Sequence, residues 1–599
     1  MDQNESVRIE IRDPEEADIL EQTDSPGSDH PGASPHAPKP PGTAGADPVC
    51  DQPPATATAD RLLHELAQAN PHQAAFTDPP NRAAFGLGEP GRYSWPEADG
   101  LASAIARQLL AHGLEPGSIV ALQMPNIREL PVLLAAIWRA GMIGVPLPMM
   151  WRLNEIHQAI AQIDPAAIVT VGTFAGHDHA ATICEAAAHH LAIRHVFSIL
   201  APQRDGVTPI DTWFDVERAL AGPDEDEETA GATPPASAAA LMTWAEGPAG
   251  PYPVPRTHAE LLAAGEAARH ELRLTGEDVV LNAYPFTTIT GVGAQFMAAL
   301  SAGASQLLHI PFDYGVFLSQ LREGAVTYTA VPPAVIEAME QRGDLAGARE
   351  LTRIGCIWPS PHASCDAYDF SGIALPVIDI YNLAELAFLM RGHAPGDQGR
   401  DLPLGKFHLP SAQDEGAAGG QPYLETRIRG CVTAENGAHR KLAGTLFVRG
   451  TSVPSGPFAS AGALSQSLLV PDAQGYLDTG ISACVDESRA GVFRCSPNQA
   501  LLYHGGAWVS AAELDRLYSE FPWFLDAAAF AISDRIMGDR IYAAVIPKPD
   551  TSPSLADLKR FLAEKGVAPY KMPDQLIIVS AIPRTSDGAV QREQILQQV

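Results

Sequence analysis

Between Ser118 and Val171 the chain alternates short apolar runs with stretches in which apolar residues recur at helical spacing. A short continuous apolar run is typical of a strand that is buried on both faces of a parallel sheet. Strands that alternate with helices build a doubly wound parallel sheet. We predict strands at 118–124, 142–147 and 167–171, and helices at 128–140 and 153–163. The rhythm resumes later, with helices predicted at 258–270, 291–302, 314–323 and 333–341, and strands at 238–243, 279–283, 305–309 and 327–331.

At 599 residues the chain is too long for a single hydrophobic core. Residues 1–56 are acidic and rich in proline, and we expect them to be disordered. Residues 57–495 are predicted to form a large N-terminal α/β domain, which becomes β-rich from about residue 400. Residues 496–599 are predicted to form a small α+β domain, with strands in YHGGAWV, AAFAISD, IYAAVIPK and QLIIVSA.

The formal net charge of −31 argues against a nucleic-acid partner, because phosphate binding needs clustered lysines and arginines. The seven cysteines are odd in number and no two have CxxC spacing, a pattern typical of reduced cytosolic thiols. No apolar stretch is long enough to span a membrane, and the acidic N-terminus lacks the apolar region of a signal peptide. The expected location is the cytoplasm.

Several segments resemble, in the correct order, motifs of the adenylate-forming superfamily, which contains AMP-dependent synthetases and acyl-CoA ligases. They are SWPEADGLASAIARQLLAHGLEPGSIVALQMPN, LLAAIWRAGMIGVPL, YPFTTITGVG, ALSAGASQLL, IYNLAEL, GTLFVRG, GYLDTG and PYKMPDQLIIVSAIPRTSDG. The resemblance covers about residues 60–599. It implies an enzyme that converts a carboxylic acid and ATP to an acyl adenylate, and then passes the acyl group to coenzyme A or a carrier-protein thiol. It also implies a small C-terminal domain that moves about a hinge near Arg494–Gln499.

The segment that matches the family's phosphate loop runs from Thr243 to Val254. In such a loop, glycines and hydroxyl residues let backbone N–H groups surround the phosphates, and a lysine adds positive charge. Here three prolines remove N–H donors, Glu246 adds negative charge, and the nearest cation is Arg256. We interpret the segment as a proline-rich turn, with a working phosphate cradle containing Thr243 as the alternative.

The resemblance assigns further roles to positions in the middle of the chain. Thr288 stands where the family usually has a histidine that lines the acyl pocket, and Gly291 follows in the same substrate-binding segment. Tyr381 would stack on adenine and Glu385 would bind magnesium. Trp358 lies in the adenine-contact segment, and we expect it to fill the site of the base itself.

Three other positions depart from the family pattern. Thr479 is retained, but Ile481 replaces the aspartate that would bind both ribose hydroxyls. Ser496–Gln499, at the expected hinge, lacks the Arg and Asp of the family. Ala589 occupies the position of the catalytic lysine, and a neutral methyl group cannot stabilise developing charge.

These departures lead to one hypothesis and two alternatives. We expect a relative of acyl-CoA ligases that has lost efficient adenylation and binds an acyl group, an acyl-thioester, a carrier protein or a synthetase partner. The first alternative is an active ATP-dependent acid–CoA ligase with divergent motifs, which would use ATP, Mg²⁺ and coenzyme A and whose candidate cations are Arg256 and Arg584. The second is a reaction on a preformed thioester or acyl adenylate, which would not need the lysine.

Overall fold

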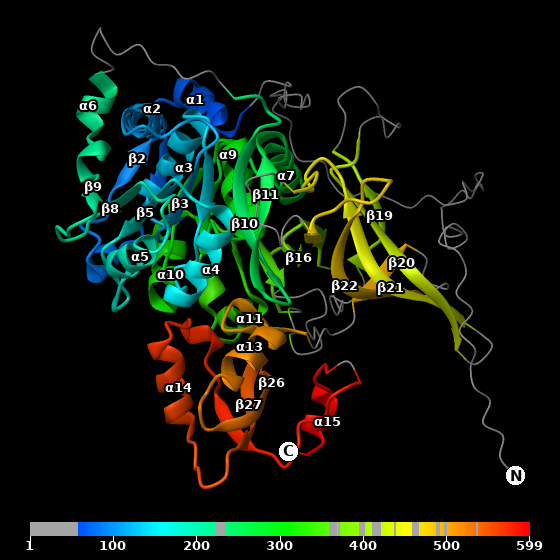
Figure 1. The fold of residues 1–599 in the computed structure, drawn as a ribbon. Coiled ribbons are helices and arrows are strands. Elements are labelled where there is room, and N and C mark those ends of the chain that lie inside the picture. The colour runs from blue at the N-terminus through cyan, green and yellow to red at the C-terminus, as the bar shows by residue number, and fades with distance from the viewer. Residues whose placement is uncertain are drawn as a thin grey trace, which may run out of the picture.

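A computed structural model shows a molecule with three parts, which are a large α/β part, a β-rich part and a small C-terminal domain (Figure 1). It describes residues 58–221, 234–358, 368, 370, 372–393, 402–409, 421–435, 439–457, 467–486, 491–495, 500–534, 537–586 and 588–598. The predicted tail at 1–56 therefore lies outside the described residues, as do residues 496–499 of the hinge predicted near Arg494–Gln499.

The first predicted sheet is confirmed and has seven strands in the order β11-β10-β4-β3-β5-β8-β9. Strands β3, β4, β5 and β8 pair in parallel, and β10 and β11 form an antiparallel hairpin at one edge. The strands are β3 (Ile119–Gln123), β4 (Ile143–Pro146), β5 (Ala167–Val171), β8 (His195–Ile199), β9 (Thr208–Pro209), β10 (Ala239–Gly247) and β11 (Gly250–Thr257). The helices in this part are α2 (Trp95–Ala111), α3 (Glu129–Arg139), α4 (Leu153–Ile163), α5 (His179–Ala187) and α6 (Val216–Ala221).

The second sheet has eight strands in the order β17-β16-β15-β14-β12-β13-β1-β2, with parallel pairs in its centre. Its strands are β1 (Ala74–Thr77), β2 (Arg92–Ser94), β12 (Val279–Asn282), β13 (Ser305–Leu308), β14 (Tyr328–Val331), β15 (Arg353–Trp358), β16 (Val377–Leu383) and β17 (Ala387–Gly392). Its helices are α1 (Ala59–Ala69), α7 (His258–Leu272), α8 (Ile289–Gly291), the π-helix η4 (Val292–Met297), α9 (Ala298–Ala302), α10 (Tyr314–Glu323) and α11 (Pro333–Gln341). The two sheets together confirm the α/β class.

The β-rich part predicted after residue 400 is a six-stranded sheet in the order β18-β23-β22-β21-β20-β19. Its strands are β18 (Leu402–Pro403), β19 (Gly405–Phe407), β20 (Leu424–Glu435), β21 (His439–Arg449), β22 (Leu477–Asp486) and β23 (Val492–Cys495). It lies beside the large α/β part, at the right of Figure 1.

The small C-terminal domain contains β24 (Leu501–His504), β25 (Ala507–Ser510), β26 (Phe524–Asp534), β27 (Gly538–Pro547) and β28 (Gln575–Ile578). Its helices are α13 (Ala511–Ser519), α14 (Leu555–Glu564), the short η8 (Pro569–Lys571) and α15 (Arg592–Leu596). The prediction of one strand through YHGGAWV was wrong. Gly505 and Gly506 have φ values of 59° and 93°, and they turn the chain so that β24 and β25 form a hairpin.

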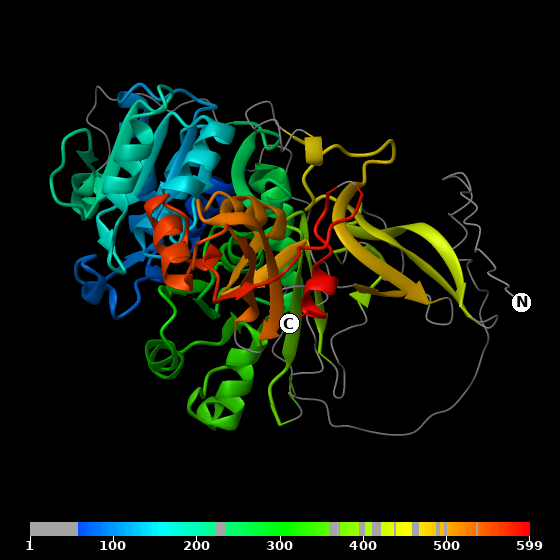
Figure 2. The ribbon, with the colours of Figure 1, turned by 60° about the horizontal axis from the view of Figure 1, so that its bottom comes forward.

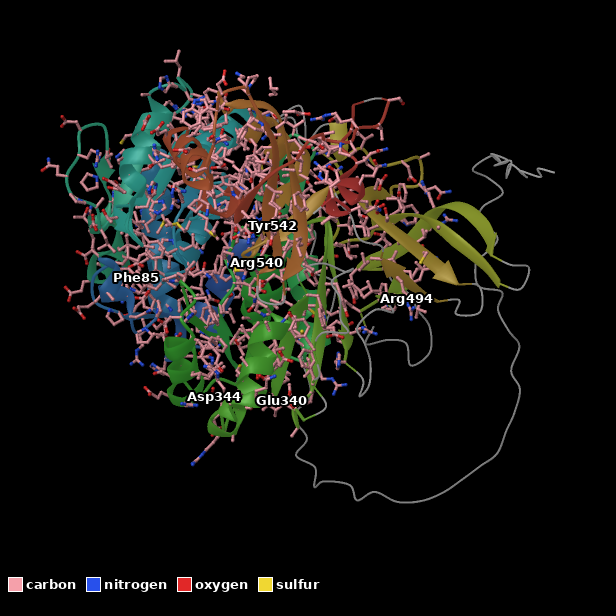
Figure 3. All side chains as sticks on the ribbon, turned by 90° about the horizontal axis from the view of Figure 1, so that it is seen from below. Phe85, Glu340, Asp344, Arg494, Arg540 and Tyr542 are labelled. Atoms are coloured by element: carbon pink, nitrogen blue, oxygen red, sulfur yellow. The ribbon has the colours of Figure 1, made fainter. Side chains whose placement is uncertain are left out.

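The small domain shares a hydrophobic core with the large one. One cluster of buried side chains joins Ile156 and Trp244 of the large domain to Leu514 and Tyr570 of the small domain. Figure 2 shows the small domain, in orange and red, between the cyan part of the large domain and the yellow strands. In Figure 3, which views the molecule from below, Arg540 and Tyr542 of β27 mark the small domain in front of the large one. No helix in the described part of the chain combines the length and apolar character needed to cross a bilayer.

A buried ion network fixes the start of α3 against the segment after β1. The guanidinium of Arg82, which is 3% exposed, donates to Asp78 Oδ2 at 2.6 Å and to Glu129 Oε1 at 2.8 Å. Two carboxylates in one buried site need this cation, because an unpaired buried charge is costly.

Replacement of Arg82 by methionine should therefore lower the free energy of unfolding by about 3 kcal/mol, because both carboxylates lose their buried partner and keep only the longer contacts with Arg128, at 3.5 Å from Asp78 and 3.4 Å from Glu129. Urea denaturation followed by circular dichroism measures the change. The control is Arg61→Met, which removes an exposed pair with Glu65 and should change the free energy by about 0.5 kcal/mol or less. Equal effects of the two substitutions would contradict the assigned role of the network.

Candidate functional site

The segment that matches the phosphate loop is a regular β-hairpin. Strands β10 and β11 pair without a break from Leu241–Arg256 to Gly247–Gly250, and only Pro248 and Ala249 form the turn. The backbone groups of the two strands thus pair with each other. The predicted proline-rich turn corresponds only to the tip of this hairpin.

Prolines occupy alternate positions of β11, at Pro251, Pro253 and Pro255. Residues two apart in a strand direct their backbone groups to the same side. Because the ladder with β10 is unbroken and β11 is the edge strand, these three nitrogens face away from β10. The outer edge of the hairpin therefore lacks the N–H donors that a phosphate cradle requires.

Arg256 connects this hairpin to the segment that carries Glu385. Its side chain is fully buried, and Nη1 donates to Thr243 Oγ1 at 3.1 Å. Nη2 donates to the backbone carbonyls of Glu385 and of Leu386, the latter at 3.1 Å. Burial lowers the pKa of Arg256 to about 10, while the negative charge of Glu385 acts in the opposite direction. Arg256 remains a cation at neutral pH, but its charge serves contacts within the protein.

The carboxylate of Glu385, the predicted magnesium ligand, also has partners within the chain. The backbone N–H of Ile289 donates to Oε2 at 2.6 Å, and Asn382 Nδ2 donates to Oε1. Burial raises the pKa of Glu385, whereas hydrogen bonds from Ile289, Asn382 and Thr243 and the charge of Arg256 lower it. In the described part of the chain, no group of three or more His, Cys, Asp or Glu residues is placed to hold a metal ion.

Tyr381 lies beside Trp358 rather than on an open surface. The two residues are cross-strand partners on β15 and β16, and their rings are nearly parallel with centroids 6.2 Å apart. The indole Nε1 of Trp358 donates to Asp379 Oδ1 at 2.8 Å, and both aromatic side chains are almost completely buried. The expectation that Trp358 fills the site of the adenine base stays a prediction, and the contact shows only that its ring packs against Tyr381. Residues 359–361 of the predicted adenine segment lie outside the described residues.

The two predicted substrate-binding residues have structural roles at the start of α8. The hydroxyl of Thr288 accepts a hydrogen bond from the N–H of Gly291 at 3.1 Å, so Thr288 is the N-cap residue. A β-carbon at Gly291 would lie 1.9 Å from the carbonyl oxygen of Pro285, so the close approach of the two backbones requires glycine.

Thr479, predicted to bind the nucleotide, donates its hydroxyl to the carbonyl of Leu446 at 2.7 Å and accepts from the N–H of Ile481 at 3.1 Å. Ile481 packs against the hydrophobic cluster that also contains Tyr381 and Trp358. The position of the ribose-binding aspartate is thus occupied by an apolar side chain that contributes to a core.

Ala589 lies in an exposed turn of the small domain. The carbonyl of Ala589 accepts from the N–H of Thr585 at 2.9 Å, and the N–H of Gly588 donates to the carbonyl of Thr585 at 3.0 Å. Arg584, one of the two candidate cations, forms an ion pair with Asp526 at 2.7 Å. The turn is thus held by the small domain through Arg584, and Ala589 adds a methyl group at its surface.

Of the predicted site residues, the structure brings Thr243 and Glu385 together, because Arg256 donates to the hydroxyl of Thr243 and to the backbone carbonyl of Glu385. The side chain of Thr479 points to the backbone of β21, that of Thr288 caps α8, and Ala589 lies in a turn of the small domain. Sequence reasoning missed two roles, the bonds of Arg256 to two carbonyls and those of Asn382 to Glu385. The sequence signal for the role of Arg256 is that an arginine stands inside a run of prolines and apolar residues at 251–257. Nothing in the sequence identifies the partners of this arginine.

The chain is similar to AMP-binding enzymes over most of its length. A family model described as AMP-binding enzyme matches residues 64–456, and one described as AMP-binding enzyme C-terminal domain matches residues 513–589. Oxalate–CoA ligase of Arabidopsis thaliana is 24% identical over 535 residues, which cover 86% of this chain and 96% of that protein. Salicyl-AMP ligase / salicyl-S-ArCP synthetase of Mycobacterium tuberculosis is 26% identical over 562 residues, 90% of each chain.

A solved structure is similar throughout most of its length. The amide bond synthetase McbA from Marinactinospora thermotolerans has a TM-score of 0.68 and 18% sequence identity, covering 90% of this chain and 99% of that one. At this identity the likeness shows the fold alone. The family match, in contrast, extends over more than half of the chain. The chain therefore belongs to the AMP-binding enzyme family, within the adenylate-forming superfamily of acyl-CoA ligase-like proteins.

Proposed function

We propose that this protein keeps the scaffold of an acyl-CoA ligase but does not catalyse adenylation efficiently. We assign residues 57–495 to its large domain and residues 496–599 to its small domain. In this proposal the protein binds an acyl group or acyl-thioester, or acts with a carrier protein or a synthetase. The four described cysteines Cys184, Cys356, Cys484 and Cys495 are free thiols, which supports a cytoplasmic location.

The observation that carries the proposal is the closed contact of Arg256, Thr243 and Glu385. In a working site, the hydroxyl and the carboxylate would face the phosphates and Mg²⁺. Here the hydroxyl accepts from Arg256, and the carboxylate accepts from Ile289 and Asn382. ATP–Mg²⁺ would have to break several buried hydrogen bonds to reach these groups, and each bond left unmade costs about 1–3 kcal/mol.

The alternative of an active ligase requires a cation at the phosphates. Arg256 and Arg584 were the candidates, and each has protein partners: Thr243 and two carbonyls for Arg256, and Asp526 for Arg584. These contacts weigh against the alternative. If activity is retained, Glu385 would bind Mg²⁺ next to ATP and coenzyme A would accept the acyl group. The relative named salicyl-S-ArCP synthetase makes a carrier-protein thiol a second candidate acceptor to test.

We expect isothermal titration of the full chain with ATP–Mg²⁺ to give no saturable heat at ligand concentrations up to about 1 mM, because the phosphate edge lacks donors and a lysine. AMP should behave in the same way. An acid–CoA ligase of the family serves as the positive control. Saturable binding of ATP to this chain would refute the loss of the nucleotide site.

Restoring the lysine alone should not restore the reaction. In an assay of pyrophosphate release with a panel of carboxylic acids, Ala589→Lys should stay at the background of the unaltered chain. The reason is that Ile481 and the prolines of β11 are unchanged in this variant. The matched control is Ser586→Lys, which adds the same charge to the same turn. Acid-dependent release that appears with Ala589→Lys but not with Ser586→Lys would favour the alternative of a nearly intact ligase.

The role of Arg256 can be tested through stability. Arg256→Met should lower the free energy of unfolding by about 3–5 kcal/mol, because the buried hydroxyl of Thr243 and the backbone carbonyls of Glu385 and Leu386 lose their donor. Arg204→Met, which removes an exposed pair with Asp178, is the control and should change it by about 1 kcal/mol or less. Urea denaturation gives both values. A change no larger than that of Arg204→Met would contradict the structural role assigned to Arg256.

A further inference from the structure

The tip of the β10–β11 hairpin contacts the small domain. Glu246 Oε1 accepts from the backbone N–H of Ser510 at 3.1 Å, and the hydroxyl of Ser510 donates to the carbonyl of Pro248 at 3.1 Å. Gly250 approaches so closely that a β-carbon there would lie 2.8 Å from Gln158 Oε1 and 3.3 Å from Glu513 Oε1. The hairpin tip is therefore inserted between α4 of the large domain and α13 of the small domain.

A buried lysine lies at the same place. Lys571 Nζ is 2.8 Å from Glu513 Oε1 and 3.4 Å from Glu155 Oε1, and the side chains of all three residues are 0% exposed. Lys571 and Glu513 belong to the small domain and Glu155 belongs to α4. The charge of Glu246 also acts on Lys571. One cation thus faces three carboxyl groups across the domain boundary.

Apolar contacts surround this cluster. Residues two apart in β10 share a face, so Met242 and Trp244 lie on the same side of the hairpin as Glu246. Both belong to the buried cluster that includes Leu514 and Tyr570 of the small domain. Trp151 packs edge-on against Trp244, with ring centroids 4.9 Å apart, and donates to the hydroxyl of Tyr570 at 3.1 Å. The charged groups therefore meet in a largely water-excluded interface.

We propose that the β10–β11 hairpin is a latch that holds the small domain in this one orientation, and that ionisation of Glu246 loosens it. The loop that would bind phosphates in a working ligase has become an internal docking element. The latch does not depend on the loss of adenylation, since its contacts would restrain the small domain whether or not ATP binds.

Burial and the neighbouring charges explain why Glu246 is the group that responds to pH. Burial raises its pKa to about 8; Lys571 lowers that pKa, whereas Glu513 and Glu155 raise it. The other charged or titratable groups next to this cluster include Tyr570, Tyr518 of α13, Tyr252 of β11 and Arg152 beside Glu155. Burial raises the pKa values of the three tyrosines, and Arg152 stays charged, so none of these four groups titrates between pH 6 and 8.

The direction of the pH effect follows from linkage. The pKa of Glu246 is higher in the docked state than the ordinary value of 4.5 expected after release. Docking is therefore strongest at low pH, and weakens as pH rises towards about 8. For one proton, the docking constant should fall by about tenfold per pH unit in this range, or about a hundredfold between pH 6 and 8.

Hydrogen–deuterium exchange of the full chain tests the latch. Opening constants are measured for peptides spanning 241–257 and 507–515, after correction for the intrinsic pH dependence of exchange. In the unaltered protein they should rise up to about a hundredfold from pH 6 to pH 8. Glu246→Gln keeps the acceptor for Ser510 but cannot ionise, so its opening constants should stay the same within about threefold. A peptide from β5 provides the internal reference.

A second pair of variants tests the cation. Lys571→Met should open the interface already at pH 6, because Glu155 and Glu513 would then face each other without the cation between them. Lys565→Met removes an exposed pair with Glu520 in the same domain and should behave like the unaltered protein. The proposal is overturned if the unaltered protein shows no pH dependence at these peptides, or if Glu246→Gln shows the same dependence.

Discussion

The site is organised around one buried cation. Arg256 joins the edge hairpin of the first sheet to the turn after β16 in the second sheet, through Thr243 and the carbonyls of Glu385 and Leu386. A charge this deep in the protein is tolerated only when nearby acceptors replace water. Next to this contact, the carboxylate of Glu385 accepts hydrogen bonds from Ile289 and Asn382, so its oxygens already have partners within the chain. The positions that family resemblance assigns to nucleotide chemistry are thus parts of a structural joint.

Much of the fold could be predicted from local patterns. The apolar runs at β3, β4 and β5 identify buried parallel strands, and Ser94 with Glu97 forms the capping box that begins α2. The partners of Arg256 and Lys571 could not be predicted, because they are up to hundreds of residues away in the chain and depend on how the two domains pack. The glycines of YHGGAWV were a local signal for a turn, and the apolar residues on either side of them obscured it.

The departures at Glu246, Ile481 and Ala589 have different structural consequences. Ile481 adds apolar surface to a core, and Ala589 accepts a backbone hydrogen bond from Thr585 in an exposed turn. Glu246 alone creates a new contact, since its carboxyl group meets the start of α13. A carboxyl group that would repel phosphates when charged fits here in its neutral form, because its oxygen accepts a hydrogen bond from the backbone N–H of Ser510, the N-cap residue of α13. Ile481 and Ala589 therefore only remove a group that the family uses, whereas Glu246 also adds a contact between the two domains.

The alternating prolines of β11 also matter before the chain is complete. Translation produces β11 before the small domain, so the contacts between this hairpin and that domain form only after β11 has been made. An uncovered strand usually offers unpaired N–H groups that can recruit a strand from another nascent chain. Here Pro251, Pro253 and Pro255 carry no hydrogen to donate. The prolines that remove donors from the phosphate edge thereby also make this edge a poor template for a strand of another chain.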